Sequence, residues 1–211
     1  MKNILIALAT AATILLAAPA FADNKSVSHN IELSGINHIE IQHSVGNVRI
    51  ERAQESNITA MAQLTGTIKA GNKRWFRRSE DLANINFDIS TRGDTLYIVF
   101  EHDNAEADFV LTIPAVESLS VKLGVGNLVA ILADQDTNVK VGVGNADLTA
   151  QLESIGAISL NTGVGDTRVT GTNQQNTTRA IVTSKVQASG QGSHPVEVKV
   201  GVGNASLDLL G

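Results

Sequence analysis

The chain contains 211 residues without a cysteine, and it carries a formal net charge of −5 at neutral pH. The lack of cysteine excludes disulfide bonds, even though export would allow them. The acidic balance argues against nucleic acid as the general partner, because binding to phosphates requires an excess of basic residues. The seven aromatic residues are also too few for the stacking platforms that commonly bind sugars or bases.

The chain begins with the layout of a secretory signal peptide. Lys2 precedes an apolar run from Ile4 to Ala18, and Ala20-Phe21-Ala22 provides a small-residue cleavage motif. The run is shorter than the roughly 20 apolar residues that a helix needs to span a membrane. We therefore expect residues 1–22 to be a signal peptide cleaved after Ala22, with no transmembrane span afterwards. Periplasmic residence is favoured over an extracellular location.

Residues 23–115 alternate apolar and polar side chains in short segments with irregular spacing, which predicts β-strands. We expect this region to be an irregular β cap on the first end of the repeats that follow, because an uncapped sheet edge would recruit other strands. The candidate strands are Ile31–Leu33, Ile39–His43, Val48–Glu51, Ile58–Ile68, Ile85–Ile89, Leu96–Phe100 and Phe109–Ile113.

One segment of this region departs from the pattern. Residues 69–78 hold five basic and two aromatic side chains in an otherwise acidic protein. Such a cluster fits an anionic partner, with the aromatic rings as anchors. A hairpin tip or short helical insertion with solvated charges explains the same residues without a partner. The candidate anionic-partner patch consists of Lys73, Arg74, Trp75, Phe76, Arg77 and Arg78.

Residues 116–211 contain four copies of a short phrase, Gly-Val-Gly followed by Asn or Asp. The copies begin at Gly124, Gly142, Gly163 and Gly201, so their starts are 18, 21 and 38 residues apart, and 38 is two steps of 19. A period near 19 fits one coil of a β-solenoid, in which each turn of chain stacks on the one before. We predict an all-β, single-domain β-solenoid that resembles a parallel β-helix, with coils of about 18–21 residues. Residues 23–115 and 116–211 would form one continuous domain.

Each copy ends a strand and marks a corner. Val121, Leu123 and Val125 alternate with other residues, and the apolar positions restart three residues later at Leu128. A strict strand would expose Leu128, so the chain must bend at Gly-Asn, where both residues tolerate left-handed backbone angles. The valine between the two glycines is expected to point inward with its equivalents. Ser44-Val45-Gly46-Asn47 repeats the scheme more weakly.

Stacked corners would bring their polar side chains into one row. An asparagine there can bond to its own turn and to the turn above, so we interpret the row as a structural corner ladder. A degenerate coil around residues 180–188, which lacks the glycines, is expected to fill the 38-residue gap. The predicted ladder consists of Asn127, Asn145, Asp166 and Asn204.

The sequence shows no motif of a serine hydrolase, zinc protease or nucleotide-binding loop, and its five histidines are not clustered like metal ligands. We therefore predict no catalytic residue, no metal and no cofactor. Two alternatives stay open. Gly142–Leu148 is close to the nonapeptide of calcium-binding β-rolls, although the other copies lack its aspartate. Some β-helices cleave polysaccharides, and the outward candidates for such an enzyme are Asp147, Arg168 and Asp208.

The chain resembles a bacterial family known as putative adhesins, also described as head-domain β-solenoids of unknown function. The resemblance rests on Leu111-Thr112-Ile113-Pro114, on Leu119–Leu123 with the first Gly-Val-Gly-Asn, and on the segment from Leu33 to Ile41. It implies an all-β repeat fold and export, and it carries over no binding residue. These features together predict an exported, non-catalytic binding or scaffold module. Its partner would be an envelope component (protein, glycan or anionic lipid headgroup), and two copies could pair through an open end of the solenoid.

Overall fold

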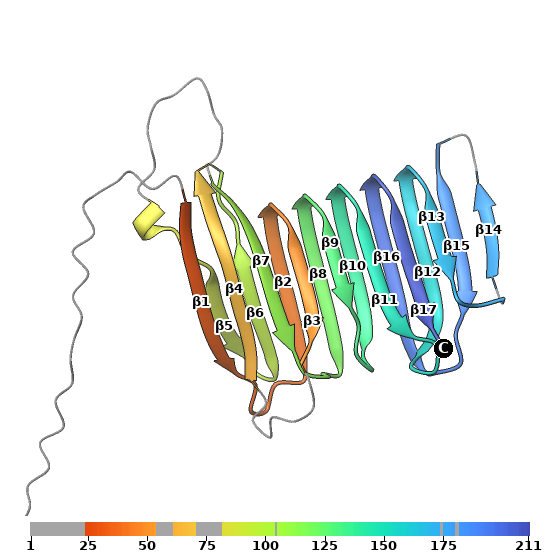
Figure 1. The fold of residues 1–211 in the computed structure, drawn as a ribbon, viewed down its shortest axis with the longest axis horizontal. Helices are drawn as coiled ribbons and strands as arrows, with labels where there is room; N and C mark the ends of the chain where they lie inside the picture. Colours follow the sequence, from red (N-terminus) through yellow and green to blue (C-terminus); the bar gives the residue numbers. More distant parts are fainter. Residues whose placement is uncertain (1–23, 54–60, 71–81, 104, 174, 180–181) are drawn as a thin grey trace, which may run out of the picture.

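The computed structural model describes residues 24–53, 61–70, 82–103, 105–173, 175–179 and 182–211. Within these ranges the chain forms two mixed β-sheets, one 3-10 helix (η1, Leu82–Asn84) and no α-helix. The two sheets face each other along an elongated molecule (Figure 1). The prediction of an all-β fold is confirmed. None of the helical structure in these ranges has the length and apolar character that crossing a membrane requires.

The strands are divided between the two sheets as follows. The eight-stranded sheet contains, from edge to edge, β1 (Asn24–Glu32), β4 (Met61–Ala70), β7 (Ala105–Ile113), β3 (Val48–Arg52), β9 (Leu128–Ile131), β11 (Ala146–Gln151), β17 (Ala205–Leu210) and β13 (Thr167–Thr170). The nine-stranded sheet contains β14 (Gln175–Arg179), β15 (Ser184–Ser189), β12 (Ile155–Val164), β16 (His194–Val202), β10 (Asp136–Val143), β8 (Ser118–Val125), β2 (His38–Val45), β6 (Thr95–Phe100) and β5 (Asp88–Arg92).

Five two-strand units repeat one geometry in the middle of the molecule. In each unit a strand of the nine-stranded sheet reaches a corner and continues as a strand of the eight-stranded sheet. Neighbouring units pair in parallel and in register, so that Val121 lies beside Ile41 on one side and Val139 on the other. Antiparallel strands flank these units, with β1, β4 and β5 toward one end and β15 and β14 at the other. The units are β2–β3, β8–β9, β10–β11, β16–β17 and β12–β13.

The order of the units in space departs from their order in the chain. The last unit, β16–β17, lies between β10–β11 and β12–β13. The predicted degenerate coil instead includes β15, which pairs antiparallel with the free side of β12. The expectation that each winding stacks on the one before is therefore correct from β8 to β11 and wrong beyond it. Residues 38–52, which the sequence placed in the N-terminal cap, form a unit of the same stack.

The core lies between the sheets and follows the alternation of each strand. In β8, Val121 is buried and Lys122 is exposed, and β10 and β16 repeat this pattern. Inward side chains stack on their equivalents in neighbouring units, so apolar surface is buried continuously along the molecule. The aromatic part of this core, near β6 and β7, consists of Phe87, Phe100 and Phe109.

The valines between the corner glycines point outward, which corrects the prediction of an inward column. Their side chains are about half exposed, for example 48% at Val125 and 49% at Val143. The second glycine of each phrase has a positive φ, 145° at Gly126 and 139° at Gly144. The chain therefore turns between the sheets at this glycine and leaves the valine on the outside of the bend. Leu128, three residues after Val125, is buried as expected.

Candidate functional site

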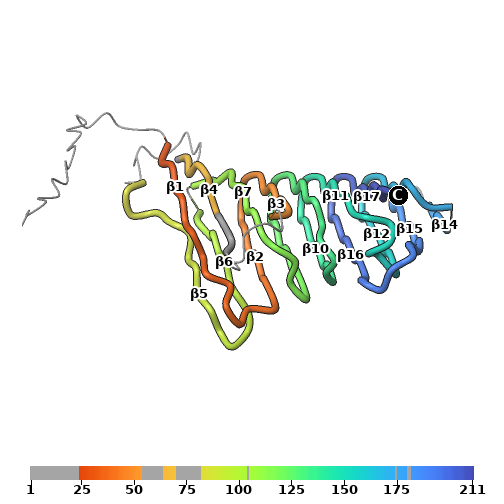
Figure 2. Tube along the Cα trace, turned by 60° about the horizontal axis from the view of Figure 1, so that its bottom comes forward, coloured from red at the N-terminus to blue at the C-terminus, as the bar shows by residue number. Residues whose placement is uncertain are grey.

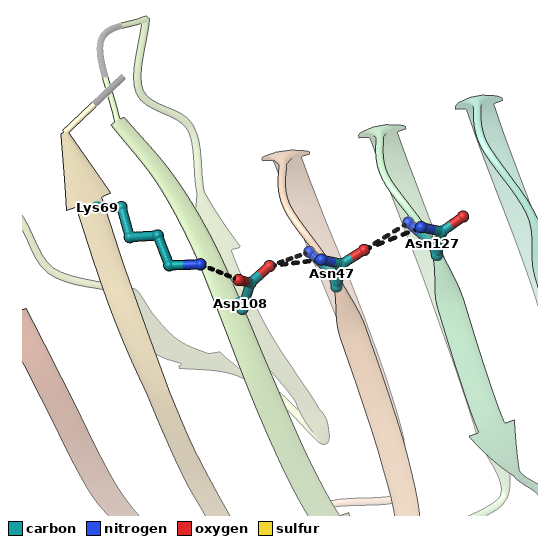
Figure 3. Close-up of polar contacts among 4 residues, drawn as sticks. All are labelled: Asn47, Lys69, Asp108 and Asn127. Carbon is teal, nitrogen blue, oxygen red and sulfur yellow. Dashed lines mark hydrogen bonds and ion pairs between the residues drawn. The ribbon is translucent and has the colours of Figure 1, made fainter. Parts of the chain in front are cut away.

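The corners are joined by a row of amide side chains. Asn127 donates from its backbone N–H and its Nδ2 to Oδ1 of Asn47, at 3.2 and 3.1 Å (Figure 3). Asn145 donates in the same way to Asn127, at 3.3 and 3.0 Å, and Asn204 donates to Asn145, at 3.1 and 3.2 Å. Asp166 completes the row through its backbone N–H, which donates to Oδ1 of Asn204 at 3.0 Å.

A carboxylate and a cation occupy each end of the row. At one end, Asp108 Oδ1 accepts both hydrogen bonds of Asn47 at 2.8 Å, and its Oδ2 accepts one from Lys69 Nζ at 2.5 Å (Figure 3). At the other end, Asp166 pairs with Arg179 at 2.9 Å. Partial burial opposes ionisation of Asp108, but the hydrogen bonds from Lys69 and Asn47 outweigh it and lower the pKa of this carboxyl. The hydrogen bond and charge of Asp108 raise the pKa of Lys69.

The direction of the row explains which residues end it. The amide N–H groups point toward Asp108, where a carboxylate that only accepts hydrogen bonds is favoured. The amide oxygens point toward Asp166, where the positive charge of Arg179 is favoured, by the same logic that places cations at the carbonyl end of a helix. The Oδ1 atoms of Asn47, Asn127 and Asn145 already accept two hydrogen bonds each, so they offer little to a cation such as calcium. The described ranges also contain no cluster of three or more potential metal ligands.

The structure thus brings the four predicted ladder residues together and adds two more. Asn47 was visible only as part of the weaker copy of the repeat. Asp108 was not assigned because its strand, β7, lacks the pair of glycines that marks the other corners. Asp108 could have been found from its neighbour, because it precedes Phe109 as Asn47 precedes Val48, and Phe109 and Val48 are in register.

A groove of about 790 Å³ crosses the outer face of the nine-stranded sheet beside the corners. Its floor is formed by the first glycine of each phrase. A Cβ atom on Gly142 would come within 2.5 Å of the carbonyl oxygen of Gly124, and one on Gly201 would come equally close to that of Gly142. Tight stacking of the strands therefore excludes side chains from the floor. The floor glycines, in spatial order, are Gly124, Gly142, Gly201 and Gly163.

A row of lysines lines this groove. Lys122, Lys140 and Lys199 lie in register on the adjacent strands β8, β10 and β16, two residues before the floor glycines. All three residues are exposed. Lys199 pairs with Glu197 at 2.6 Å, whereas Lys122 and Lys140 form no ion pair within the part of the chain that the structure describes. The hydrogen bond from Lys199, aided by its charge and that of Lys140, lowers the pKa of Glu197.

Uncharged polar groups continue the lysine row on both sides. Gln42 in β2 is in register with Lys122, and Asn161 in β12 is in register with Lys199. The strands under the groove each pair with a neighbour on both sides, so their backbones present no free edge. The groove can therefore offer a ligand ammonium, amide and hydroxyl groups, but no main-chain ladder. Its other polar side chains, among the described residues, belong to Ser44, Glu101 and Thr183, whereas the side chains of His43 and Thr162 are buried between the sheets.

The outward candidates for an enzyme, which lie in the described ranges, do not form a catalytic site. The basic patch at residues 73–78 lies outside the described residues. Asp147 and Asp208 lie on the outer face of the eight-stranded sheet and accept hydrogen bonds from Ser206, at 2.6 Å, and from Thr170. Ser206 also stands between Asp147 and Arg168 in the strand register. This arrangement does not support the polysaccharide-cleaving alternative.

His43 is a buried titratable residue at a position where the next unit has Leu123. Its ring lies between the sheets, 3% exposed, with centroids 5.5 Å from Phe100 and 5.2 Å from Phe109. Neither ring nitrogen has a partner in hydrogen-bonding geometry. Burial lowers the pKa of His43 to about 4, against smaller opposing effects of the Ala107 backbone and the Asp108 charge. The ring is therefore neutral at pH 7 and serves as a core side chain.

No protein-family model and no curated protein matches this sequence. Solved structures are similar to it. A putative cell adhesion protein from Clostridium sporogenes has a TM-score of 0.53 at 14% identity, over 89% of this chain and 100% of its own. Putative adhesins from Parabacteroides merdae (0.32, 14% identity, 60% and 53%) and Bacteroides fragilis (0.29, 10%, 87% and 97%) align less closely. The first similarity confirms, at the level of the fold, the resemblance to bacterial putative adhesins that the sequence indicated.

Proposed function

We propose that this protein is an exported, non-catalytic binding or scaffold module whose ligand lies in the glycine-floored groove. The observation that carries the proposal is the groove itself, an exposed floor without side chains beside a regular row of lysines. Because the lining residues sit on paired strands, their positions are fixed before a ligand arrives. The fold shared with a putative cell adhesion protein supports binding as the activity.

The architecture that we propose is a two-sheeted β-solenoid. Its support is the parallel, in-register stacking of the five two-strand units and the amide row that joins their corners. Each unit buries its apolar side chains mainly against equivalents in its neighbours, as in other repeat proteins. The solenoid we propose has one exchange of order, with β16–β17 inserted before β12–β13.

Capture from envelope extracts tests the binding function. The immobilised mature protein is compared with a Lys122→Ala/Lys140→Ala variant of the groove and with a variant of the basic patch. We expect one or more envelope components that the wild type and the patch variant retain and the groove variant loses. Equal recovery by all three proteins contradicts the groove, and loss from the patch variant alone transfers the site to residues 73–78. The patch variant replaces Lys73, Arg74, Arg77 and Arg78 with Ala.

Export is part of the same proposal. Residues 1–22, which lie outside the described ranges, are proposed as a signal peptide, and the mature chain would begin at Asp23 in the periplasm. Cell fractionation followed by mass determination of the purified protein tests this. A cytoplasmic protein that retains residues 1–22 contradicts export while leaving the groove experiment intact.

We also propose that two copies pair through the open end of the stack. Within the described residues, β13 is the last strand of the eight-stranded sheet and pairs with β17 on one side only. Unpaired strand edges favour association with another strand. Light scattering over a range of concentrations should show a dimer, and a monomer at every concentration contradicts the pairing.

A further inference from the structure

This inference rests on the binding function proposed above, and it uses the chemistry of the groove to identify the class of ligand. We infer that the groove binds a linear polysaccharide that carries carboxylates, such as a polyuronate, laid across the strands parallel to the lysine row. The groove spans five neighbouring strands, β2, β8, β10, β16 and β12. Because adjacent strands are about 4.8 Å apart, this corresponds to a footprint about 19 Å long.

The lysine row fits a polymer with evenly spaced negative charges. Its three ammonium groups stand on successive strands, and the strand spacing is similar to the advance of one sugar unit along an extended polysaccharide. Like charges directly opposite each other in a sheet are destabilising. Glu197 pairs with Lys199, and its charge also acts on Lys140. Neither Lys122 nor Lys140 forms an ion pair in the described ranges, however, and the two lie side by side. An external polyanion would remove this repulsion and accept charge-assisted hydrogen bonds from both.

Apart from the carboxylate of Glu101, which follows β6 at one end of the groove, the rest of the lining fits the sugar part of such a polymer. Gln42 and Asn161 extend the lysine row on either side, and Ser44 and Thr183 lie at the two ends of the glycine row. Their amide and hydroxyl groups can both donate to and accept from sugar hydroxyls. The glycine floor and the methylene stems of the lysines supply a flat apolar surface for the C–H faces of the rings.

Other extended ligands fit less well. A peptide bound as an added strand needs free backbone groups, and the strands under the groove are paired on both sides. Single-stranded nucleic acid needs aromatic rings on which its bases stack, and the described lining contains no Phe, Tyr or Trp. The same lack excludes a sugar held by ring stacking, but a polyuronate can be held through its carboxylates and hydroxyls by the lysine, amide and hydroxyl groups of the lining. A lipid headgroup places charge at one end of an apolar chain, whereas the lysines continue over three adjacent strands.

Calorimetric titration of the mature protein with a polygalacturonate oligomer, long enough to cross five strands, tests the inference. We expect binding that weakens as salt is added, because salt screens exposed charges. Lys122→Ala/Lys140→Ala should raise the Kd by about tenfold, since it removes two charge-assisted contacts. Gln42→Lys, which extends the row to a fourth strand, should lower the Kd by about threefold. Circular dichroism checks that each variant is folded.

A matched control separates the groove from the overall charge of the protein. Arg49→Ala/Arg168→Ala removes two positive charges from exposed residues on the opposite sheet, and it should leave the Kd unchanged. Equal weakening by both double variants would overturn the inference, as would equal affinity for neutral dextran.

Three further outcomes would also overturn it. These are tighter binding of poly-L-glutamate, tighter binding of phosphatidylglycerol vesicles, and no binding of polygalacturonate by the wild-type protein. None of these outcomes contradicts the proposed binding function itself. Capture of a groove-dependent ligand of another class from envelope extracts would still support that function.

Discussion

The two ends of the stack fill the space between the sheets with different side chains, and the molecule narrows from one to the other (Figure 2). At the wide end, near β6 and β7, aromatic rings occupy the interior. Phe87 packs against Phe100 and against Phe109 with ring centroids 5.1 Å apart in both cases, and His43 lies beside them. Burial and packing of large apolar side chains stabilise this end, which also contains one imidazole without hydrogen-bond partners.

At the narrow end, near β12, β13 and β15, hydroxyl groups join the two sheets at the corner. Thr167 in β13 and Ser184 in β15 share a hydrogen bond of 2.7 Å across the two sheets. Thr162 Oγ1 donates to the carbonyl oxygen of Gly165 at 2.9 Å. At this corner Thr162 and Thr167 take the places that Leu123 and Leu128 hold in β8–β9, while the rest of the interior at this end, beyond these hydroxyl groups, stays apolar. The comparison teaches that a stack of similar units can end in two ways. Large aromatic side chains can fill a wide interior, or hydroxyl side chains can form hydrogen bonds from one sheet to the other.

Truncation of one core residue at the wide end and of one nearer the narrow end should give the largest effect and sharpen this comparison. Phe100→Ala should lower the free energy of unfolding by about 3–5 kcal/mol, because it opens a cavity among packed rings. Val200→Ala, at a buried position closer to the narrow end, should cost about 2 kcal/mol. Denaturant unfolding followed by circular dichroism measures both, with the outward-facing Val99→Ala as the control. Equal losses from both buried positions would break the comparison.

Acid should weaken the wide end through His43. The folded state lowers the pKa of this ring from 6.5 to about 4, so unfolding takes up a proton between these values. The stabilisation is therefore complete above pH 6.5 and is lost as the pH falls through 4, by about 3 kcal/mol in all.

Replacement of His43 isolates this contribution from that of the carboxylates. Leu123 occupies the equivalent place in the next unit, so His43→Leu suits the pattern of the stack. The difference in unfolding free energy between the wild type and His43→Leu should grow as the pH falls from 7 to 4. A difference that stays constant over this range contradicts the assignment.

Much of the stack could be predicted from the sequence because the strand pattern and the corner phrases are local. The order of the units could not, because Val139-Lys140-Val141 and Val198-Lys199-Val200 offer the same side chains to either neighbour. The choice depends on contacts between residues far apart in the chain. The outward valines were mispredicted for a related reason, since alternation alone does not say which of the two glycines bends the backbone.

The groove was harder to foresee than the ladder. Each phrase is preceded by a polar residue two positions before its first glycine, and in three copies it is Lys122, Lys140 and Lys199. These three become one row only when β16 pairs with β10, and the chain order instead places Asn161 next to Lys140. The sequence therefore contained the charged residues but not their adjacency.

Removal of the cross-sheet hydrogen bond should weaken the narrow end. Ser184→Ala deprives the hydroxyl and the backbone N–H of Thr167 of their partner, and it should cost about 2 kcal/mol. Hydrogen exchange should show the loss in β13 and β15 while β6 and β7 keep their protection. Ser189→Ala, an exposed position in the same strand, is the control. Uniform loss of protection along the molecule would show that the two ends are not separate.

Substitutions between Asn and Asp in the corner row should change the free energy of unfolding least. They compare a position in the middle of the row with one at its end. At an end, Asp166 needs only its backbone N–H for the row, so Asp166→Asn should change the stability by less than about 0.5 kcal/mol. In the middle, Nδ2 of Asn145 donates to Oδ1 of Asn127 at 3.0 Å. Asn145→Asp replaces this donor with a carboxylate oxygen, which faces the Asn127 oxygen and repels it. We expect a loss of about 1 kcal/mol at pH 7.

The pH dependence distinguishes a broken amide row from a general effect of charge. The introduced carboxyl can donate to Asn127 only when it is protonated, so its pKa should lie above the ordinary value of Asp in the folded protein. The deficit of Asn145→Asp relative to the wild type should then shrink as the pH falls below that pKa, because the protonated form restores the missing donor. Thermal melts of the two proteins at matched pH values measure the difference. A deficit that persists undiminished in acid would mean that donation along the row does not stabilise the corners.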